Sequence, residues 1–261
     1  SGPKKFIDTN IYGTFNLLEI SRLYFSELEI SKKDNFKLHH ISTDEVFGDL
    51  DGANGFFNED SLYKPSSPYS ASKASSDHLV RSWCRTFGLP TIITNCSNNY
   101  GPYHFPEKLI PSIILKAING IDIPIYGNGK QVRDWLYVDD HAEALITTLL
   151  SDKINITYCI GGDSQMQNIE VVNKILEILS SKGQLNNVDH NNLIKYIDDR
   201  PGHDVKYAVD ASKIKNELGW KPKENFESGI IKTIDWYLEN KDWWQPLINM
   251  NSSLNLLGED A

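Results

Sequence analysis

Tyr69 and Lys73 are the two side chains of this 261-residue chain best suited by type and spacing to acid–base chemistry. They follow Pro68 in a stretch where Ser66 or Ser67 can cap a helix, and residues four apart lie on one helical face. A nearby ammonium favours ionisation of a phenol. The spacing therefore predicts that Lys73 lowers the pKa of Tyr69 and makes it a general base.

The Tyr-x-x-x-Lys spacing alone is not specific, because the chain contains it twice more. The pair Tyr126 and Lys130 spans two glycines and is a poor helix candidate, while Tyr237 and Lys241 lie in a late helix with no reactive strand before them. Only Tyr69 follows a strand that ends in polar, reactive groups.

A hydroxyl and two adjacent carboxyls follow the strand predicted at 36–41 after one residue, Ser42; they belong to Thr43, Asp44 and Glu45. In open α/β sheets the carboxyl ends of strands face the ligand crevice, so we expect these groups to point at a substrate. Two carboxyls in one pocket can take different pKa values and act as separate acid and base. Taken alone, Asp44 and Glu45 could equally begin a simple turn.

The elements that must position these groups alternate between helix and strand in the first part of the chain. Apolar periodicity predicts helices at 10–27 and 68–87 and strands at 36–41 and 90–96. Further helices are expected at 106–119, 139–150, 168–180, 211–218 and 226–239, strands at 121–125, 157–160 and 194–197, and a surface loop at 181–192. This order predicts an α/β fold.

Composition excludes several classes of protein. The net charge is −9 and the basic residues are scattered among acidic ones, so we expect no nucleic acid and no membrane as partner. The isolated cysteines Cys84, Cys96 and Cys159 are interpreted as reduced core thiols of a cytoplasmic protein. No metal-binding motif is present, and we expect no metal site.

Several long segments resemble the short-chain dehydrogenase/reductase superfamily, NAD-dependent epimerase/dehydratase family, and most closely its dTDP-glucose 4,6-dehydratases. The similar segments are 9–14, 42–48, 68–73, 94–111, 124–127, 132–138 and 199–204. Related epimerases have a Ser/Thr-rich segment without the carboxyl pair of Asp44 and Glu45. That pair favours the dehydratase over the epimerase.

The resemblance implies a Rossmann-type doubly wound parallel sheet and a smaller mixed α/β substrate domain. We expect the NAD-binding domain to comprise 1–99 and 134–163, the nucleotide-sugar domain 100–133 and 164–244, and a polar tail 245–261. The Gly-rich turn GxGxxG is absent. In the family it precedes the residue matching Ser1, so we expect a half-unit of on the order of ninety residues to be missing before Ser1.

The resemblance also implies a lyase of deoxysugar biosynthesis that holds NAD and converts dTDP-glucose to dTDP-4-keto-6-deoxyglucose. C4 is oxidised, water is eliminated across C5 and C6, and the hydride returns to C6. The catalytic residues implied are Thr43, Asp44, Glu45, Tyr69 and Lys73, and the cofactor contacts are Thr9, Tyr69, Lys73 and Asn99. Besides Thr43, the substrate contacts implied are Asn98, Lys108, Leu109, Pro124, Ile125, Tyr126, Arg133, Asn168, Arg200 and His203.

Two alternatives stay open at this point. One is another nucleotide-sugar enzyme of the superfamily, such as an epimerase, a decarboxylase or a dehydratase for UDP or GDP sugars. The other is an inactive fragment that binds nucleotide only. The family further implies a homodimer through the helices at 10–27 and 68–87.

Overall fold

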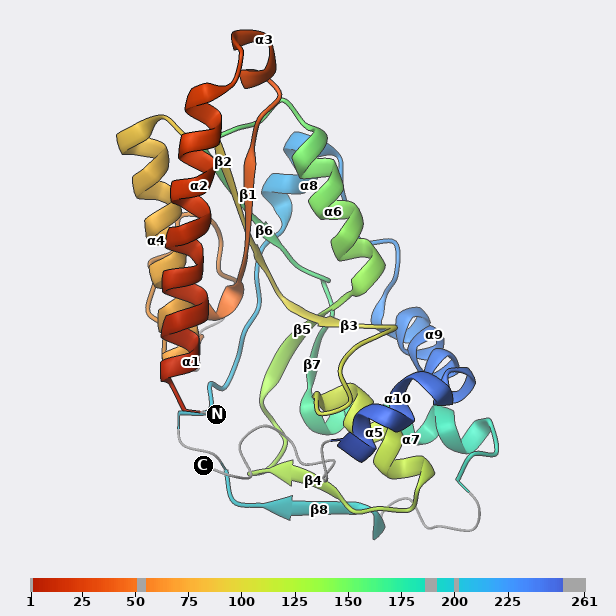
Figure 1. The fold of residues 1–261 in the computed structure, drawn as a ribbon. Helices are drawn as coiled ribbons and strands as arrows, with labels where there is room; N and C mark the ends of the chain where they lie inside the picture. Colours follow the sequence, from red (N-terminus) through yellow and green to blue (C-terminus); the bar gives the residue numbers. More distant parts are fainter. Residues whose placement is uncertain (1, 51–54, 186–191, 200–201, 251–261) are drawn as a thin grey trace. The chain divides into compact units, whose positions relative to one another are not determined.

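The structure, a computed structural model, describes residues 2–50, 55–185, 192–199 and 202–250. The chain divides into two compact units (Figure 1). The first comprises Ser1–Ser97, Asp140–Gly161 and Lys206–Lys221, and the second Asn98–Asp139, Gly162–Val205 and Pro222–Ala261. Both are built from strands and helices, as the sequence predicts.

A three-stranded parallel sheet forms the centre of the first unit, in the order β1-β2-β6. Its strands are β1 (Leu38–Thr43), β2 (Thr91–Cys96) and β6 (Ile156–Ile160). The helical elements around them are α1 (Lys4–Phe6), a π-helical segment (Ile7–Tyr12), α2 (Gly13–Glu27), α3 (Ile30–Lys33), a short 3₁₀ helix η2 (Asp44–Phe47), α4 (Pro68–Phe87), most of α6 (Val138–Leu150), and α8 (Ser212–Leu218). β2 is buried along most of its length because it lies between two strands and under helices.

Helices cover both faces of this sheet. In Figure 1, α2 and α4 lie side by side on one face, and α6 and α8 lie on the other. Successive strand residues point to opposite faces. His40 of β1 accordingly contacts Asp77 of α4, whereas its neighbour His39 lies close enough to His141 of α6 to affect its pKa. The sheet therefore separates two buried polar regions, and only the α4 side adjoins Tyr69 and Lys73.

The second unit combines a three-stranded sheet, in the order β3-β5-β7, with a parallel pair of strands, β4 and β8. Its strands are β3 (Asn98–Tyr100), β4 (Ile123–Tyr126), β5 (Val132–Tyr137), β7 (Gln165–Gln167) and β8 (Ile194–Ile197), and its helices are α5 (Leu109–Ile118), α7 (Asn168–Ser181), α9 (Phe226–Glu239) and α10 (Lys241–Met250). Apolar side chains of α5, α7 and α9 share one core, with Ile114, Ile175 and Ile230 fully buried.

The sequence missed three strands, β3, β5 and β7. β5 is the longest of the three. It was missed because Arg133 and Asp134 interrupt its apolar pattern. Both side chains are nevertheless buried. Asp134 accepts hydrogen bonds from the backbone N–H groups of Gly162 and Ser164, at 2.9 and 2.7 Å. A satisfied carboxylate can lie inside a strand where an unsatisfied one cannot.

The two largest differences from the expected domain boundaries concern residues 206–221 and 134–139. Residues 206–221 belong to the first unit, because Phe57 forms a parallel bridge to Val209 and exchanges backbone hydrogen bonds with Ala208 and Asp210. Residues 134–139 belong to the second unit, because β5 pairs with β3 and β7. The expected polar tail is helical as far as Met250, in α10, and 251–261 lie outside the described residues.

Within the described part of the chain, no helix is both long and apolar enough to cross a bilayer. The three cysteines are free, as predicted. Only Cys159 is fully buried, however, so the prediction of core thiols was wrong for Cys84 and Cys96, which are partly exposed.

Candidate active site

The carboxyl end of β1 turns directly into η2, and this turn presents the predicted hydroxyl and carboxyls. Thr43 has extended backbone angles, and its hydroxyl accepts a hydrogen bond from the Glu45 N–H at 3.3 Å, as a helix N-cap does. The same hydroxyl donates to Asp44 at 3.3 Å. Val46 and Phe47 are buried and anchor the turn from below.

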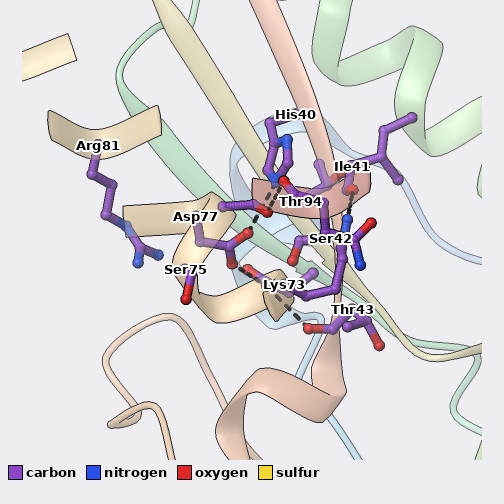
Figure 2. A network of polar contacts seen from close by, with 12 residues as sticks. His40, Ile41, Ser42, Thr43, Lys73, Ser75, Asp77, Arg81 and Thr94 are labelled. Carbon is purple, nitrogen blue, oxygen red and sulfur yellow. Dashed lines mark hydrogen bonds and ion pairs between the residues drawn. The ribbon is translucent and has the colours of Figure 1, made fainter. Parts of the chain in front are cut away.

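Helix α4 begins at Pro68, as predicted, with Ser67 as its cap. Ser67 and Ser70 form a reciprocal capping box. Tyr69 and Lys73 follow one turn apart, and the Lys73 ammonium donates to the backbone carbonyl of Ile41 in β1 at 2.8 Å (Figure 2). That hydrogen bond connects the start of α4 to the last residues of β1, the strand that leads into Asp44 and Glu45.

The Tyr69 phenol is buried and feels the charge of the two η2 carboxyls. Its pKa is raised, first by burial and then by the negative charges of Glu45, Cys96 and Asp44. The charges of the two η2 carboxyls thus act on the Tyr69 phenol. The predicted lowering of the Tyr69 pKa by Lys73 was wrong for the protein alone, because Lys73 bonds to Ile41 and burial, together with nearby negative charges, raises the pKa of Tyr69.

The residues that resemble cofactor contacts fit a nucleotide cofactor chemically. Tyr69 and Lys73 offer a hydroxyl and an ammonium, a donor set suited to a ribose diol. Thr9 is exposed in the π-helical segment, next to Asn10, whose side chain donates to Ser72 of α4 at 2.9 Å. Asn99 belongs to β3 in the second unit.

Four of the predicted substrate residues gather at the end of β4. Pro124, Ile125 and Tyr126 lie in β4, and the Tyr126 ring meets the His203 ring edge-on, with centroids 6.3 Å apart. His203 Nδ1 is 2.7 Å from a carboxylate oxygen of Asp199.

The remaining substrate residues are spread over other elements of the same unit. Lys108 precedes α5 and Leu109 begins it, Asn98 lies in β3 opposite Trp135, and Asn168 begins α7. The side-chain oxygens of Asn98 and Asn168 are buried and have no protein partner among the described residues, as groups awaiting a polar ligand would. Arg200 lies outside the described residues.

Arg133 is more enclosed than a surface phosphate ligand. It is only 6% exposed, and its guanidinium donates to the carbonyls of Val132 at 2.8 Å and Asp204 at 3.0 Å. At least two of its five N–H groups therefore serve the backbone. These bonds hold the guanidinium in one orientation.

Sequence reasoning missed four residues that position the site. Asn95 of β2 donates a hydrogen bond to Asp77 of α4 at 3.0 Å. Asp199, which also contacts His203, accepts a hydrogen bond from Gln131 at 2.9 Å. Asp77 carried a detectable signal, because it lies four residues after Lys73 on the same helical face. Asp199 lies in the similar segment 199–204, four residues before His203, but its second partner, Gln131, is distant in sequence. In the described residues, no cluster of three or more His, Cys, Asp or Glu side chains is arranged to hold a metal ion.

A parallel sheet with a Tyr–Lys helix and a polar strand end defines a Rossmann-type enzyme of the short-chain dehydrogenase/reductase class. Comparisons with known proteins narrow this class. The family model described as GDP-mannose 4,6 dehydratase matches residues 1–233. The dTDP-glucose 4,6-dehydratase of Neisseria meningitidis serogroup B is 56% identical over 257 residues, which cover 97% of this chain and 72% of that protein. The chain therefore belongs to this family of nucleotide-sugar 4,6-dehydratases.

Solved structures agree with the sequence comparison. The dTDP-glucose 4,6-dehydratase of Bacillus anthracis, solved in complex with NAD, is 42% identical with a TM-score of 0.82, and the match covers 95% of this chain and 73% of that one. The dTDP-glucose 4,6-dehydratase of Streptomyces venezuelae, solved with NAD bound, has a TM-score of 0.84 at 38% identity, covering 94% and 70%. NAD is therefore the cofactor of this fold.

Proposed function

We propose that this protein converts dTDP-glucose to dTDP-4-keto-6-deoxyglucose, a dehydration in which NAD+ is a tightly held catalyst. The observation that carries the proposal is that Asp44 and Glu45, in the turn capped by Thr43, act electrostatically on Tyr69. A Tyr–Lys pair alone serves oxidation at C4. Loss of water across C5 and C6 requires an additional acid and base, and the two carboxyls supply them.

In the first step Tyr69 takes the proton from the sugar O4, while the Thr43 hydroxyl holds O4 by a hydrogen bond. Bound NAD+ supplies the acceptor for the C4 hydride and the donor that later delivers it to C6. Lys73 holds the phenol and the cofactor ribose. We expect the pKa of Tyr69 to fall when a cationic cofactor lies beside it, because a positive charge opposes the two carboxylates.

The resulting C4 ketone makes the C5 proton acidic. Glu45 removes that proton, the C6–O6 bond breaks, and Asp44 gives a proton to the departing hydroxyl, which leaves as water. A C5–C6 double bond forms. Glu45, after exchanging its proton with solvent, returns a proton to C5 and is a carboxylate again. Before the next turnover Asp44 regains a proton and Tyr69 releases the one taken from O4, both by exchange with solvent.

The second unit binds the nucleotide half of the substrate. Pro124, Ile125 and Tyr126 pack on the base, and Arg133 and Arg200 present planar donors to the diphosphate. The other contacts proposed are Asn98, Lys108, Leu109, Asn168 and His203. The buried, unpartnered oxygens of Asn98 and Asn168 support this assignment.

We also propose a homodimer through α2 and α4 in the cytoplasm, where free cysteines are stable. Leu17, Ile20 and Tyr24 form an apolar stripe on α2 and are 62%, 64% and 57% exposed.

Ile20→Glu should give a monomer by light scattering. Ile30→Glu, at an exposed apolar residue outside the stripe, should stay dimeric. Dimeric Ile20→Glu would contradict this interface.

The function is tested by incubating the full-length protein with dTDP-glucose and NAD+ and identifying the product by NMR. We expect the 4-keto-6-deoxy sugar. A C4 epimer as sole product would show that the dehydratase assignment is wrong. UDP- and GDP-glucose assayed in parallel establish the nucleotide preference.

A further inference from the structure

Asp77 is a fully buried carboxylate that the mechanism does not use. It lies on α4 four residues after Lys73 and eight after Tyr69, on the same helical face, and it is 0% exposed. An uncompensated charge at such a position is strongly destabilising. Its retention requires a set of matched partners.

Side chains from three different segments supply those partners. His40 of β1 lies 3.1 Å from one carboxylate oxygen (Figure 2). Tyr63 and Asn95 donate to the other at 2.6 and 3.0 Å. A carboxylate only accepts hydrogen bonds, so His40 must carry its proton on Nε2. Arg81 donates to the Tyr63 hydroxyl at 2.8 Å and extends the network.

Hydrogen bonds from Asn95 and from Lys73 reach the backbone of β1 at two points. The Asn95 amide donates both to Asp77 and to the backbone carbonyl of Thr43, at 3.1 Å for the latter. One turn earlier on α4, Lys73 donates to the carbonyl of Ile41. Asp77 and Lys73 therefore hold the last residues of β1 against the helix that carries Tyr69.

Electrostatics reinforces this geometry. Burial raises the pKa of Asp77, but hydrogen bonds from His40 and Tyr63 outweigh it and leave the pKa below its usual value. Burial lowers the pKa of Lys73, and the charge of Asp77 opposes that change. The ionised carboxylate thus favours the charged form of the lysine.

We propose that Asp77 is a positioning residue of the dehydratase, which keeps Thr43, Asp44 and Glu45 in register with Tyr69 and Lys73 through its bonds to His40, Tyr63 and Asn95. This proposal rests on the proposed function, because the effect that it predicts is on turnover. Asp77 itself does not touch the substrate. Its role is to fix the separation of two groups of side chains that must act on one hexose ring.

The central test compares Asp77→Asn with Asp77→Glu in the full-length protein. Asparagine turns an N–H donor toward Tyr63 or Asn95, so we expect kcat to fall about 100-fold, as a displacement of about 1 Å would cause. The Kd for dTDP should not change, because its proposed residues lie in the other unit. Asp77→Glu should recover about 10-fold in kcat over Asp77→Asn by restoring the charge.

Glu27→Gln is the matched control, because it removes the same charge from an exposed residue of α2 and should leave kcat unchanged. An unchanged kcat in Asp77→Asn would overturn the proposal. Equal losses of kcat and dTDP affinity would also overturn it, because they would indicate general unfolding. No advantage of the glutamate over the asparagine would do the same.

Tyr63→Phe decides the question if Asp77→Asn does not fold. It keeps the ring, which packs edge-on against Phe47, and removes the hydroxyl that donates to Asp77 and accepts from Arg81. We expect kcat to fall about 10-fold, and full activity would refute the role of the network.

Hydrogen exchange separates this proposal from the proposed function. In Tyr63→Phe the amides of residues 41–45 should exchange about 10-fold faster than in the parent protein, and those of β6 should be unchanged. Faster exchange with no dehydration by the parent protein would refute the function only. Unchanged exchange with an active parent would refute the role of Asp77.

Discussion

Gly48, which ends the turn carrying Asp44 and Glu45, offers a sharp test of how this site is built. Its backbone angles, φ 87° and ψ −155°, lie in a region that only glycine populates readily. A Cβ built there would lie 2.2 Å from the backbone carbonyl oxygen of Lys64. Gly48→Ala must therefore move η2, Lys64 or both by about 1 Å to reach ordinary contact.

The expected cost has two parts. The backbone conformation costs about 1–3 kcal/mol. Separating the two segments also weakens the bond from the Lys64 N–H to the Val46 carbonyl, now 3.0 Å long, which costs about 1 kcal/mol. We expect Gly48→Ala to lower the free energy of unfolding by about 2–4 kcal/mol. Since Asp44 and Glu45 move with the turn, kcat should fall about 100-fold.

Gly88→Ala is the matched control. Gly88 has φ 68° at the end of α4, and a Cβ there meets nothing within 4 Å. It should cost about 1 kcal/mol and leave kcat unchanged. Urea unfolding followed by tryptophan fluorescence and assay of the 4-keto product measure the two effects. Equal stability losses in both variants, with normal turnover in Gly48→Ala, would refute the reasoning.

Three further predictions follow from single residues. Glu45→Gln should abolish deuterium incorporation at C5 in D₂O and slow product formation by about 10²- to 10⁴-fold, and NMR showing normal exchange would remove Glu45 as the base. Burial lowers the pKa of His141 to about 4 from 6.5, so its folded form binds the proton less readily than the unfolded chain. Stability should therefore fall as pH drops from 6.5 to 4, by on the order of 3 kcal/mol for this residue, and His141→Gln should show a shallower loss in urea titrations. Asp199→Ala removes a partner of both Gln131 and His203 and should weaken dTDP binding about 10-fold by calorimetry, whereas unchanged affinity would show that this carboxylate does not position the nucleotide site.

Helices with strong local signals were predictable to within a residue or two. α4 and α9 have the predicted bounds, because Ser67, Pro68 and Gly88 mark the ends of α4 and Asn225 caps α9. The start of the first helix was wrong, since helical structure already begins at Lys4. β5 was missed because a charged pair interrupts it, and its burial depends on backbone donors about thirty residues later in the chain.

The candidate site was predictable where its residues are close in sequence. Thr43, Asp44 and Glu45 form one contiguous run, and Tyr69 and Lys73 share a helical face. Their electrostatics was not predictable. The sequence predicted that the Lys73 ammonium lowers the pKa of Tyr69. In the structure Lys73 instead donates to the Ile41 carbonyl, and burial and nearby negative charges raise the pKa of Tyr69.

By itself, the sequence determined the kind of chemistry and the elements that carry it, because residue type, helical spacing and strand ends are local properties. Only the tertiary structure decided which groups meet. Asp77 receives bonds from β1, β2 and the segment before α4, and Asp199 joins Gln131 to His203. These contacts depend on how parallel strands align and on which side chains burial forces into pairs, and a linear pattern carries no record of either.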